Sequence, residues 1–266
     1  MRIRHLLPHA QEPLLFAHRG LHRAHIENTL DAFLAARDAG VPGIELDVHL
    51  TADEKLVVFH DDRTGRIEAQ LHEKTDGLAP DVPASLSKNR DSGPRNLVIE
   101  EATLTQIRQL AIGPIVPTLD DVFDALGSSV YYDIELKTRT RTSRGLEAQT
   151  AETIRRHGLL EYCVVSSFNP FALRHFRKAQ PGIPLGIIWT TSHELYWFLR
   201  HGEGAVLGGA DFLKPEWDIV MKHGWLLRLS GRPFIPWSVN DPQRARLLLE
   251  QGAAGIISDA ADSIAR

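Results

Sequence analysis

Short apolar runs alternate with amphipathic segments along most of the 266-residue chain. This alternation predicts β-strands joined by crossover helices, which is the pattern of a parallel sheet. After the first strand, for example, Leu30, Phe33 and Leu34 share one face of a predicted helix. Parallel strands are expected over residues 14–17, 43–48, 130–136, 161–166, 184–188, 210–213, 233–237 and 255–257. Eight strands make a closed α/β barrel, so the predicted fold is a TIM (β/α)8 barrel.

A further apolar run, over residues 55–59, follows the second strand too closely for a helical crossover, which takes a dozen or more residues. The connection between the two is turn-like, so the run is expected to pair antiparallel with the second strand as a β-hairpin extension. A turn centred on Asp53 and Glu54 would place Asp47 opposite His60 across this hairpin.

The strand–helix rhythm is interrupted over residues 61–117. Residues 76–96 are rich in Pro, Ser, Asp and Gly and are predicted to form a loop, and a helix is expected near residues 104–110. Long loops inside compact domains are usually functional or disordered. We therefore expect a single barrel domain over residues 1–266, with an inserted cap at about 61–117 beside the active mouth.

Charge and composition exclude several classes of protein. The formal net charge is −4, and acidic and basic residues are mixed along the chain, without the basic stripe of a nucleic-acid-binding protein. The sequence has no run of about 18 apolar residues, so stable membrane insertion is not expected. No apolar core of a signal peptide precedes the first predicted strand. The single cysteine, Cys163, suits a reducing compartment, so a cytoplasmic protein is expected, and nothing in the sequence indicates its oligomeric state.

Acidic side chains recur on one face of two predicted strands. Glu45 and Asp47 are two residues apart, so their side chains point to the same side of the sheet. Asp133, Glu135 and Lys137 repeat this spacing in the next parallel strand. In a barrel the shared face is the interior and its C-terminal mouth, where these side chains are expected to converge.

Converging carboxylates repel one another unless they are protonated or bound to a cation. Oxygen ligands suit a hard ion, whereas zinc would favour His and Cys. We therefore predict that Glu45, Asp47 and Glu135 bind one divalent cation, Mg²⁺ or Ca²⁺. The alternative is a structural ion-pair network in which Arg19 and Lys137 neutralise the acids.

Two histidines are candidates for proton transfer, because imidazole is the side chain that titrates nearest neutral pH. His18 and His60 each end a predicted strand and each precede a charged residue. Both positions are expected to open onto the mouth where the carboxylates gather. On either side of a phosphate, one could serve as general base and the other as general acid, so these two are the predicted catalytic pair.

Several short motifs follow one another along nearly the whole chain. They are Ala17-His18-Arg19-Gly20, Glu27-Asn28-Thr29, Glu45-Leu46-Asp47-Val48, His60-Asp61, Pro117-Thr118-Leu119, Ile134-Glu135-Leu136-Lys137, Ser166-Ser167-Phe168, Trp237-Ser238-Val239-Asn240 and Gly255-Ile256-Ile257-Ser258-Asp259. Each motif is weakly specific by itself, but the ordered set resembles the glycerophosphodiester phosphodiesterase family.

The resemblance implies a phospholipase C-like TIM barrel and metal-dependent hydrolysis of small-molecule glycerophosphodiesters to sn-glycerol 3-phosphate and an alcohol. It assigns the three acids to one divalent cation and the two histidines to acid–base catalysis. By the same resemblance, Arg19 would contact the phosphate through its planar guanidinium, Lys137 would add positive charge, and Trp237 would form a wall of the substrate pocket. Two departures are Ile26, where the family usually has proline, and the stretch over residues 61–117, which would shape the pocket.

Two other functions are compatible with these motifs. A lipid phosphodiester substrate would make this a lysophospholipase D or a phosphoinositide phospholipase C-like enzyme. Such a substrate calls for an exposed apolar lip, and the candidates for it are Trp189, Tyr196, Trp197, Phe198, Phe212, Trp217 and Trp225. The alternative outside enzymes is a phosphate-binding module on a decayed barrel, and the presence of both histidines and all three acids argues against it.

Overall fold

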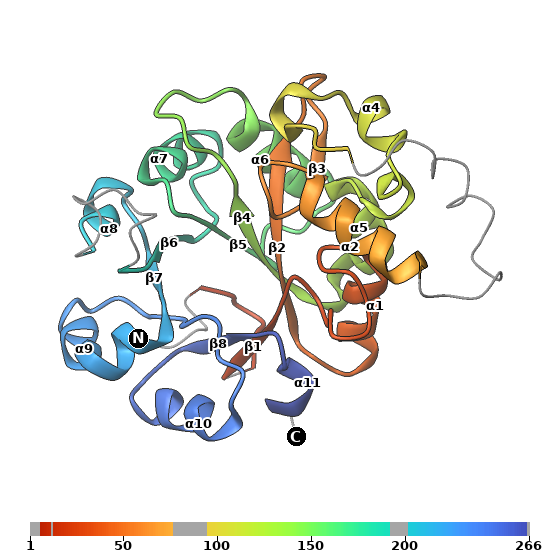
Figure 1. The fold of residues 1–266 in the computed structure, drawn as a ribbon. Coiled ribbons are helices and arrows are strands. Elements are labelled where there is room, and N and C mark those ends of the chain that lie inside the picture. The colour runs from red at the N-terminus through yellow and green to blue at the C-terminus, as the bar shows by residue number, and fades with distance from the viewer. Residues whose placement is uncertain (1–5, 12, 77–94, 192–201, 265–266) are drawn as a thin grey trace.

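The computed structural model of the chain describes residues 6–11, 13–76, 95–191 and 202–264. Seven parallel strands form a curled sheet in the order β7-β6-β5-β4-β2-β1-β8 (Figure 1). Their bounds are Leu14–His18 (β1), Gly43–Leu50 (β2), Tyr131–Leu136 (β4), Cys163–Ser167 (β5), Leu185–Trp189 (β6), Phe212–Pro215 (β7) and Gly255–Ser258 (β8). The predicted α/β class, with a parallel sheet that curls toward a barrel, is confirmed.

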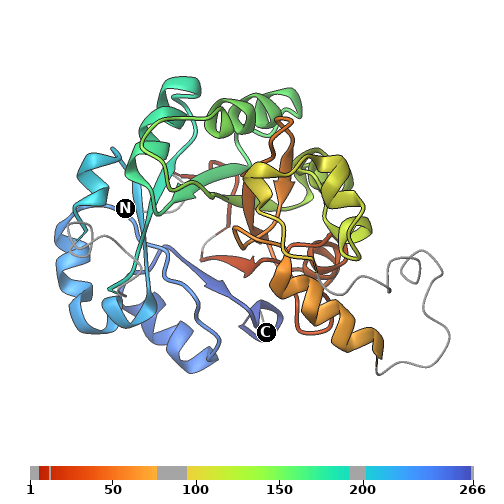
Figure 2. The same cartoon turned by 45° about the horizontal axis from the view of Figure 1, so that its top comes forward.

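Helices connect the strands and lie around the outside of the curled sheet, as Figures 1 and 2 show. Polar caps start several of them, for example Thr29, whose hydroxyl accepts from the amide of Ala32, and Thr118, which forms a capping box with Asp121. The helices are α1 (Leu30–Asp38), α2 (Gly65–Asp76), α4 (Leu104–Arg108), α5 (Leu119–Leu126), α6 (Leu146–Arg156), α7 (Pro170–Ala179), α8 (Gly204–Leu207), α9 (Trp217–Leu229), α10 (Pro242–Glu250) and α11 (Ala261–Ile264). Short 3-10 turns are η3 (Ile99–Glu101), η4 (Gly113–Ile115) and η5 (Gly127–Ser129).

The gap between β7 and β8 is bridged by residues 233–239. On the β7 side, the amide of Ile235 donates to the carbonyl of Leu213 at 2.9 Å. On the β8 side, the amide of Ile257 donates to the carbonyl of Pro236 at 3.0 Å. The prolines of the segment have no N–H to donate, so it forms isolated bridges rather than the regular strand predicted at residues 233–237. That strand prediction is therefore wrong, although the segment occupies the expected place between its neighbours.

The hairpin after β2 is present, but its register differs from the prediction. β3 (Leu56–Val58) pairs antiparallel with β2 so that Asp47 lies opposite Phe59, and the predicted pairing of Asp47 with His60 is wrong by one residue. The cause is a turn one residue longer than expected, in which Glu54 adopts a left-handed φ of 57°. Each residue added to a hairpin loop shifts the pairing of the strands that follow.

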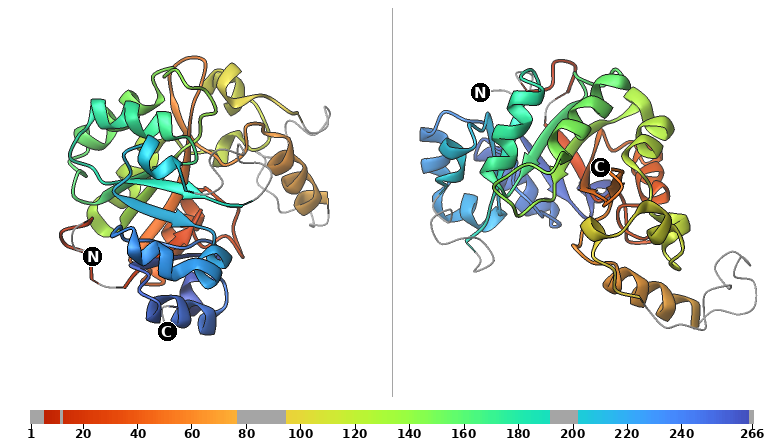
Figure 3. Two further views of the ribbon diagram at one scale, coloured as in Figure 1. Left: turned by 90° about the vertical axis from the view of Figure 1, so that its left-hand side faces the viewer. Right: turned by 90° about the horizontal axis from the view of Figure 1, so that it is seen from above.

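After β3 the chain forms α2, η3, α4 and η4 before it returns to the helical layer at α5. Figures 2 and 3 show α2 extending away from the barrel. The helix predicted near residues 104–110 is found as α4, and the loop predicted at 76–96 lies mostly outside the described residues. A hydrophobic cluster of its own joins this segment to β3, and its buried members are Val57, Phe59, Ile67, Ile99, Ala102, Ile107, Leu110, Ile112 and Val116.

Two other clusters form the barrel core. The larger lies between the sheet and the helices and includes Ile44, Leu46 and Val48 of β2, which alternate with the acids. The smaller fills the inside of the barrel, and its buried members are Leu6, Leu7, Ala10, Leu14, Phe16, Val164, Phe212, Ile235 and Ile257. Because these apolar residues fill the N-terminal end of the barrel, its polar interior groups gather at the C-terminal ends of the strands.

Of the four described aromatic residues considered for an apolar lip, three are packed inside. Phe212 is fully buried, and Trp189 and Trp217 pack partly buried against the main core. Trp225 on α9 is 57% exposed. Tyr196, Trp197 and Phe198 lie outside the described residues. Within the described part of the chain, none of the helices combines the length and the apolar character that crossing a bilayer requires.

Close packing inside the barrel predicts the effect of a substitution at Gly186. A Cβ at this position of β6 would lie 2.3 Å from the Phe212 ring, so Gly186→Val is expected to lower the free energy of unfolding by about 1–3 kcal/mol. Urea unfolding measures the change. Gly182→Ala is the matched control, because a Cβ there meets no atom within 4 Å. Equal stability of the two variants would contradict the packing described here.

Candidate active site

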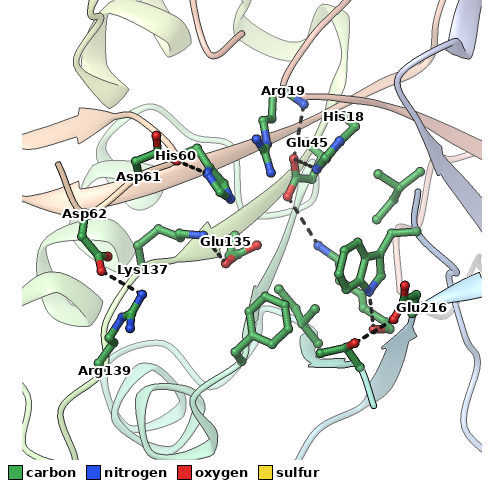
Figure 4. A pocket seen from close by; sticks show the side chains of 16 residues that line it. His18, Arg19, Glu45, His60, Asp61, Asp62, Glu135, Lys137, Arg139 and Glu216 are labelled. Carbon is green, nitrogen blue, oxygen red and sulfur yellow. Dashed lines mark hydrogen bonds and ion pairs between the residues drawn. The ribbon is translucent and has the colours of Figure 1, made fainter. Parts of the chain in front are cut away.

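A pocket of about 830 Å³ opens at the C-terminal ends of the strands (Figure 4). Its walls include seven of the eight residues predicted from sequence: His18, Arg19, Glu45, His60, Glu135, Lys137 and Trp237. The eighth, Asp47, is buried and contacts Arg19 and Lys137 at the base of the site. Residues far apart in the sequence therefore meet in one place, as the barrel interpretation requires.

The three predicted metal ligands form a compact acidic cluster. Glu45 and Asp47 come from β2 and Glu135 from β4, and parallel pairing sets Asp47 beside Glu135. One ligand oxygen from each lies within 4.8 Å of the others, and all three residues are buried. Asn28 holds Asp47 in place by donating from its side-chain amide to Oδ2 at 2.8 Å. The cluster could hold a metal ion.

Nearby cations neutralise part of this cluster. Lys137 Nζ lies 2.9 Å from Glu135 Oε1 and 3.4 Å from Asp47 Oδ1, and Arg19 Nε lies 3.4 Å from Asp47 Oδ2. Burial alone would raise the pKa of Asp47, but Lys137 and Arg19 hold it well below its ordinary value. The ion pairs that the structural alternative requires are therefore present around two of the three acids.

The negative charge of Glu45 is the one that Lys137 and Arg19 neutralise least. Burial, and next the charge of Asp47, raise the pKa of Glu45 to about 8. The amide of Arg19 donates to Glu45 Oε2 at 3.3 Å, and Lys214 Nζ is 3.7 Å from Oε1. A buried carboxylate that is unfavourable when ionised, beside two others, fits the oxygen-rich site of a hard divalent cation.

His18 is oriented from behind by a carboxylate. Its Nδ1 donates to Asp259 Oδ1 at 2.6 Å, while Nε2 lies 3.9 Å from Glu45 Oε2. Asn240 donates to the other oxygen of Asp259 at 2.7 Å. Burial by itself would raise the pKa of Asp259, but the hydrogen bonds from His18 and His22 hold it far below its usual range. A carboxylate at Nδ1 fixes the imidazole tautomer and leaves Nε2 for chemistry.

His60 has the same arrangement on the other side of the acidic cluster, with Arg19 and Glu45 between the two histidines in Figure 4. Its Nδ1 donates to Asp61 Oδ1 at 2.6 Å. Burial by itself would raise the pKa of Asp61, but hydrogen bonds from His60 and Arg66 hold it well below its ordinary value. Each predicted catalytic histidine thus has an ionised carboxylate at Nδ1.

Arg66, at the start of α2, links this histidine to Arg19. Its guanidinium donates to Asp61 Oδ2 at 2.6 Å and to Glu27 Oε1 at 2.6 Å. Arg19 donates to the same Glu27 oxygen at 3.0 Å. The segment inserted after β3 is therefore bonded to both sides of the site.

Arg19 and Trp237 lie where a substrate would meet them. Within the described residues, the buried Arg19 Nε makes no hydrogen bond, although Asp47 Oδ2 lies 3.4 Å away, and the Arg19 side chain lines the pocket. Trp237 donates from Nε1 to the carbonyl of Lys214 at 2.9 Å and packs edge-to-face on Phe168, with ring centroids 5.9 Å apart. The indole is thus held rigidly as one wall of the pocket.

Sequence reasoning did not identify Lys214 of β7, which is only 2% exposed. Its Nζ lies 2.8 Å from Asp133 Oδ2 and 2.9 Å from Ser166 Oγ. Burial would lower its pKa, but Asp133 and Glu45 raise it, so the ammonium remains charged. A lysine inside the apolar run Phe212-Leu213-Lys214-Pro215 was the available sign of a buried charge. The roles of Asp61 and Asp259 as histidine partners were also missed, although both stood in recognised motifs.

Comparison with known proteins agrees with this site. A model of the glycerophosphoryl diester phosphodiesterase family matches residues 18–263. The glycerophosphodiester phosphodiesterase of Caldanaerobacter subterraneus subsp. tengcongensis is 28% identical over 248 residues, covering 92% of this chain and 93% of that protein. The glycerophosphodiester phosphodiesterase of Bacillus altitudinis is 29% identical, with 93% of this chain and 95% of that protein covered.

Solved structures share the fold. An Oleispira antarctica phosphodiesterase, in complex with the product sn-glycerol-3-phosphate, gives a TM-score of 0.71 at 23% identity, covering 100% of this chain and 98% of that one. A glycerophosphodiester phosphodiesterase from Thermotoga maritima gives 0.68 at 23% identity, covering 97% and 99%. Because the family model spans nearly the whole sequence, this chain belongs to the glycerophosphoryl diester phosphodiesterase family, a family of phosphoric diester hydrolases.

Proposed function

We propose that this protein hydrolyses glycerophosphodiesters to sn-glycerol 3-phosphate and an alcohol, using a divalent cation and two histidines. The observation that carries the proposal is the meeting of three buried carboxylates and two carboxylate-backed imidazoles at one pocket. Family membership supports it, as does the product bound to the structural relative from Oleispira antarctica.

Glu45, Asp47 and Glu135 would hold the cation, Mg²⁺ or Ca²⁺. When bound, it would withdraw charge from the phosphoryl oxygens as negative charge develops there. Arg19 is proposed to assist, because its guanidinium is positively charged and the residue lines the pocket. Lys137 adds positive charge beside Glu135, and Trp237 forms a wall of the pocket.

His18 and His60 are the proposed acid–base pair. One takes the proton of the nucleophile, and the other gives a proton to the alcohol as its bond to phosphorus breaks. The nucleophile is water, which gives sn-glycerol 3-phosphate directly, or the substrate's own glycerol 2-hydroxyl, which gives a cyclic phosphate that water must then open. Asp259 and Asp61, bonded at the two Nδ1 atoms, hold each imidazole in one tautomer and one orientation.

We further infer that residues 61–117 act as a cap on a single barrel domain. Asp61 and Asp62, at the start of this segment, line the pocket, and Asp62 Oδ2 lies 2.8 Å from Arg139 on the rim. A cytoplasmic location is also proposed. The proposal is based on the single cysteine of the chain, Cys163, a buried free thiol that suits a reducing compartment.

The activity itself is tested with a panel of glycerophosphodiesters that differ in their alcohol group. We expect release of sn-glycerol 3-phosphate, measured by a coupled enzymatic assay, and loss of the activity in EDTA with recovery on adding Mg²⁺ or Ca²⁺. Lysophosphatidylcholine, the control for a lipid substrate, should be a poor substrate. Full activity in the chelator would remove the cation from the proposal.

Replacing either histidine should slow turnover without unfolding the protein. His18→Ala and His60→Ala are each expected to lower kcat by about 10²–10⁴-fold, because general acid–base catalysis is lost. Replacing the alcohol by p-nitrophenol, which leaves without a proton, should restore much of the rate to only one variant, the one that lacks the general acid. His9→Ala is the control, because His9 pairs with Glu161 outside the pocket. Near-normal kcat in either pocket variant would exclude that residue.

The raised pKa of Glu45 predicts a pH-dependent stability in EDTA. Between pH 4.5 and about 8 the folded state retains a proton that the unfolded state has released, so stability falls as the pH rises through this window. The slope is at most about 1.4 kcal/mol per pH unit. Urea unfolding of the wild type and Glu45→Gln isolates the contribution, which the amide lacks.

Saturating Mg²⁺ should stabilise the wild type most at the alkaline end of this window, because the cation binds the ionised cluster. Glu45→Gln should gain less stability from Mg²⁺. The assignment of a cation to this cluster would be contradicted if the free energy of unfolding in EDTA varied with pH identically in the two proteins and Mg²⁺ did not stabilise the wild type.

A further inference from the structure

A second group of metal-ligating side chains lies beside the acidic cluster. His18, His22 and Asp259 each offer one ligand atom, and the three atoms lie within 4.8 Å of one another. Asp259 Oδ1 is 2.6 Å from His18 Nδ1 and 3.2 Å from His22 Nε2. His22 does not line the pocket and has no part in the chemistry proposed above.

The backbone around β1 brings these residues together. Pairing of β1 with β8 sets Ala17 beside Ser258, so the next residues, His18 and Asp259, leave the sheet side by side. Arg19 and Gly20 then adopt left-handed φ values of 55° and 81°, which reverse the chain. Gly20 also has no room for a side chain, since a Cβ would lie 2.7 Å from the Ala32 backbone. This tight turn returns His22 to the carboxylate.

The donor set differs in kind from the acidic cluster. Two imidazole nitrogens and one carboxylate oxygen suit a borderline transition metal ion such as Zn²⁺, whereas three carboxylates suit Mg²⁺ or Ca²⁺. Asn240 donates to Asp259 Oδ2 at 2.7 Å and so leaves Oδ1 directed at the two histidines. All three side chains are partly exposed, which gives an ion a path from solvent.

We propose that His18, His22 and Asp259 form a second cation site, selective for transition metal ions, whose occupation inhibits the enzyme. The inhibitory effect rests on the proposed function, because it requires that His18 carry a proton during turnover. The metal ion would bind His18 Nδ1 and His22 Nε2 in place of a proton, and each imidazole would keep its single proton on its other ring nitrogen. His18 Nε2 would then hold that proton as an N–H and could no longer accept one, so the proton transfer proposed for His18 would stop.

This site and the acidic cluster respond to different ions. Mg²⁺ and Ca²⁺ prefer oxygen ligands and leave the imidazoles free, so they fill the acidic cluster without inhibition. Zn²⁺ takes the nitrogen-containing site even when the acidic cluster is saturated with Mg²⁺. The enzyme would therefore be active with hard cations and inactive when transition metal ions are in excess.

The test is a Zn²⁺ titration of activity in saturating Mg²⁺, with wild type, His22→Gln and His25→Gln. His25 lies in the same loop, outside the donor group, and is the matched control. We expect Zn²⁺ to inhibit wild type and His25→Gln alike, and the Zn²⁺ concentration for half inhibition to rise at least about tenfold in His22→Gln. His22→Gln should retain its activity without Zn²⁺, and His22→Asn provides a second substitution.

Co²⁺ provides a readout that does not depend on catalysis. In saturating Mg²⁺, Co²⁺ bound by two imidazoles and a carboxylate should give the visible absorption of a four-coordinate ion in wild type and His25→Gln, and lose it in His22→Gln. Equal Zn²⁺ inhibition of wild type and His22→Gln, as expected if Zn²⁺ simply displaces Mg²⁺, would overturn the proposal. Absence of the Co²⁺ spectrum in wild type would do so as well. A wild type without phosphodiesterase activity that still binds Co²⁺ would instead refute the proposed function.

Discussion

Burial of like charge at the mouth of the barrel is the constraint on which the site depends. Glu45, Asp47, Asp133 and Glu135 lie on two adjacent strands in parallel register, and all are buried. Such a group is stable only if positive charge is brought to it. The chain supplies three cations, Arg19, Lys137 and Lys214, each from a different strand or strand end. Glu45 remains the least compensated, which is why a further cation fits there.

The turn after β1 serves several of these contacts at once. The turn ends the strand at His18. It also directs the Arg19 amide to Glu45 and the Arg19 guanidinium toward Asp47. It also brings His22 back to Asp259. Left-handed φ at two successive residues is unusual, and here Gly20 meets the Ala32 backbone so closely that no side chain would fit. A short stretch of strained backbone thereby links the acidic cluster, the acid–base pair and the second donor group.

The segment inserted after β3 is bonded to residues of the active site. Arg66 joins Asp61, the partner of His60, to Glu27, the partner of Arg19. The hydrophobic cluster beneath it rests on Val57 and Phe59, at and just beyond the end of β3. The segment thus has a hydrophobic base of its own and reaches the active site through Arg66.

Local patterns in the sequence determined much of this protein. Alternation of apolar and acidic residues placed Glu45, Asp47 and Glu135 on one inner face, because side chains in a strand alternate between faces whatever surrounds it. The strand–helix order likewise indicated a parallel α/β sheet, and seven of its strands are present. Charge at strand ends pointed to His18 and His60, which the fold brings to one pocket.

Only the tertiary structure decided which distant groups meet. The one-residue shift of the hairpin came from a left-handed Glu54 in the turn, and the loss of a regular strand at residues 233–237 came from prolines between two strands. The acid that pairs with Lys214 was decided only once β7 lay near β4. The carboxylate partner of His18 was decided only once β8 lay beside β1. Contacts between segments far apart in the chain depend on register and packing, which short-range patterns do not contain.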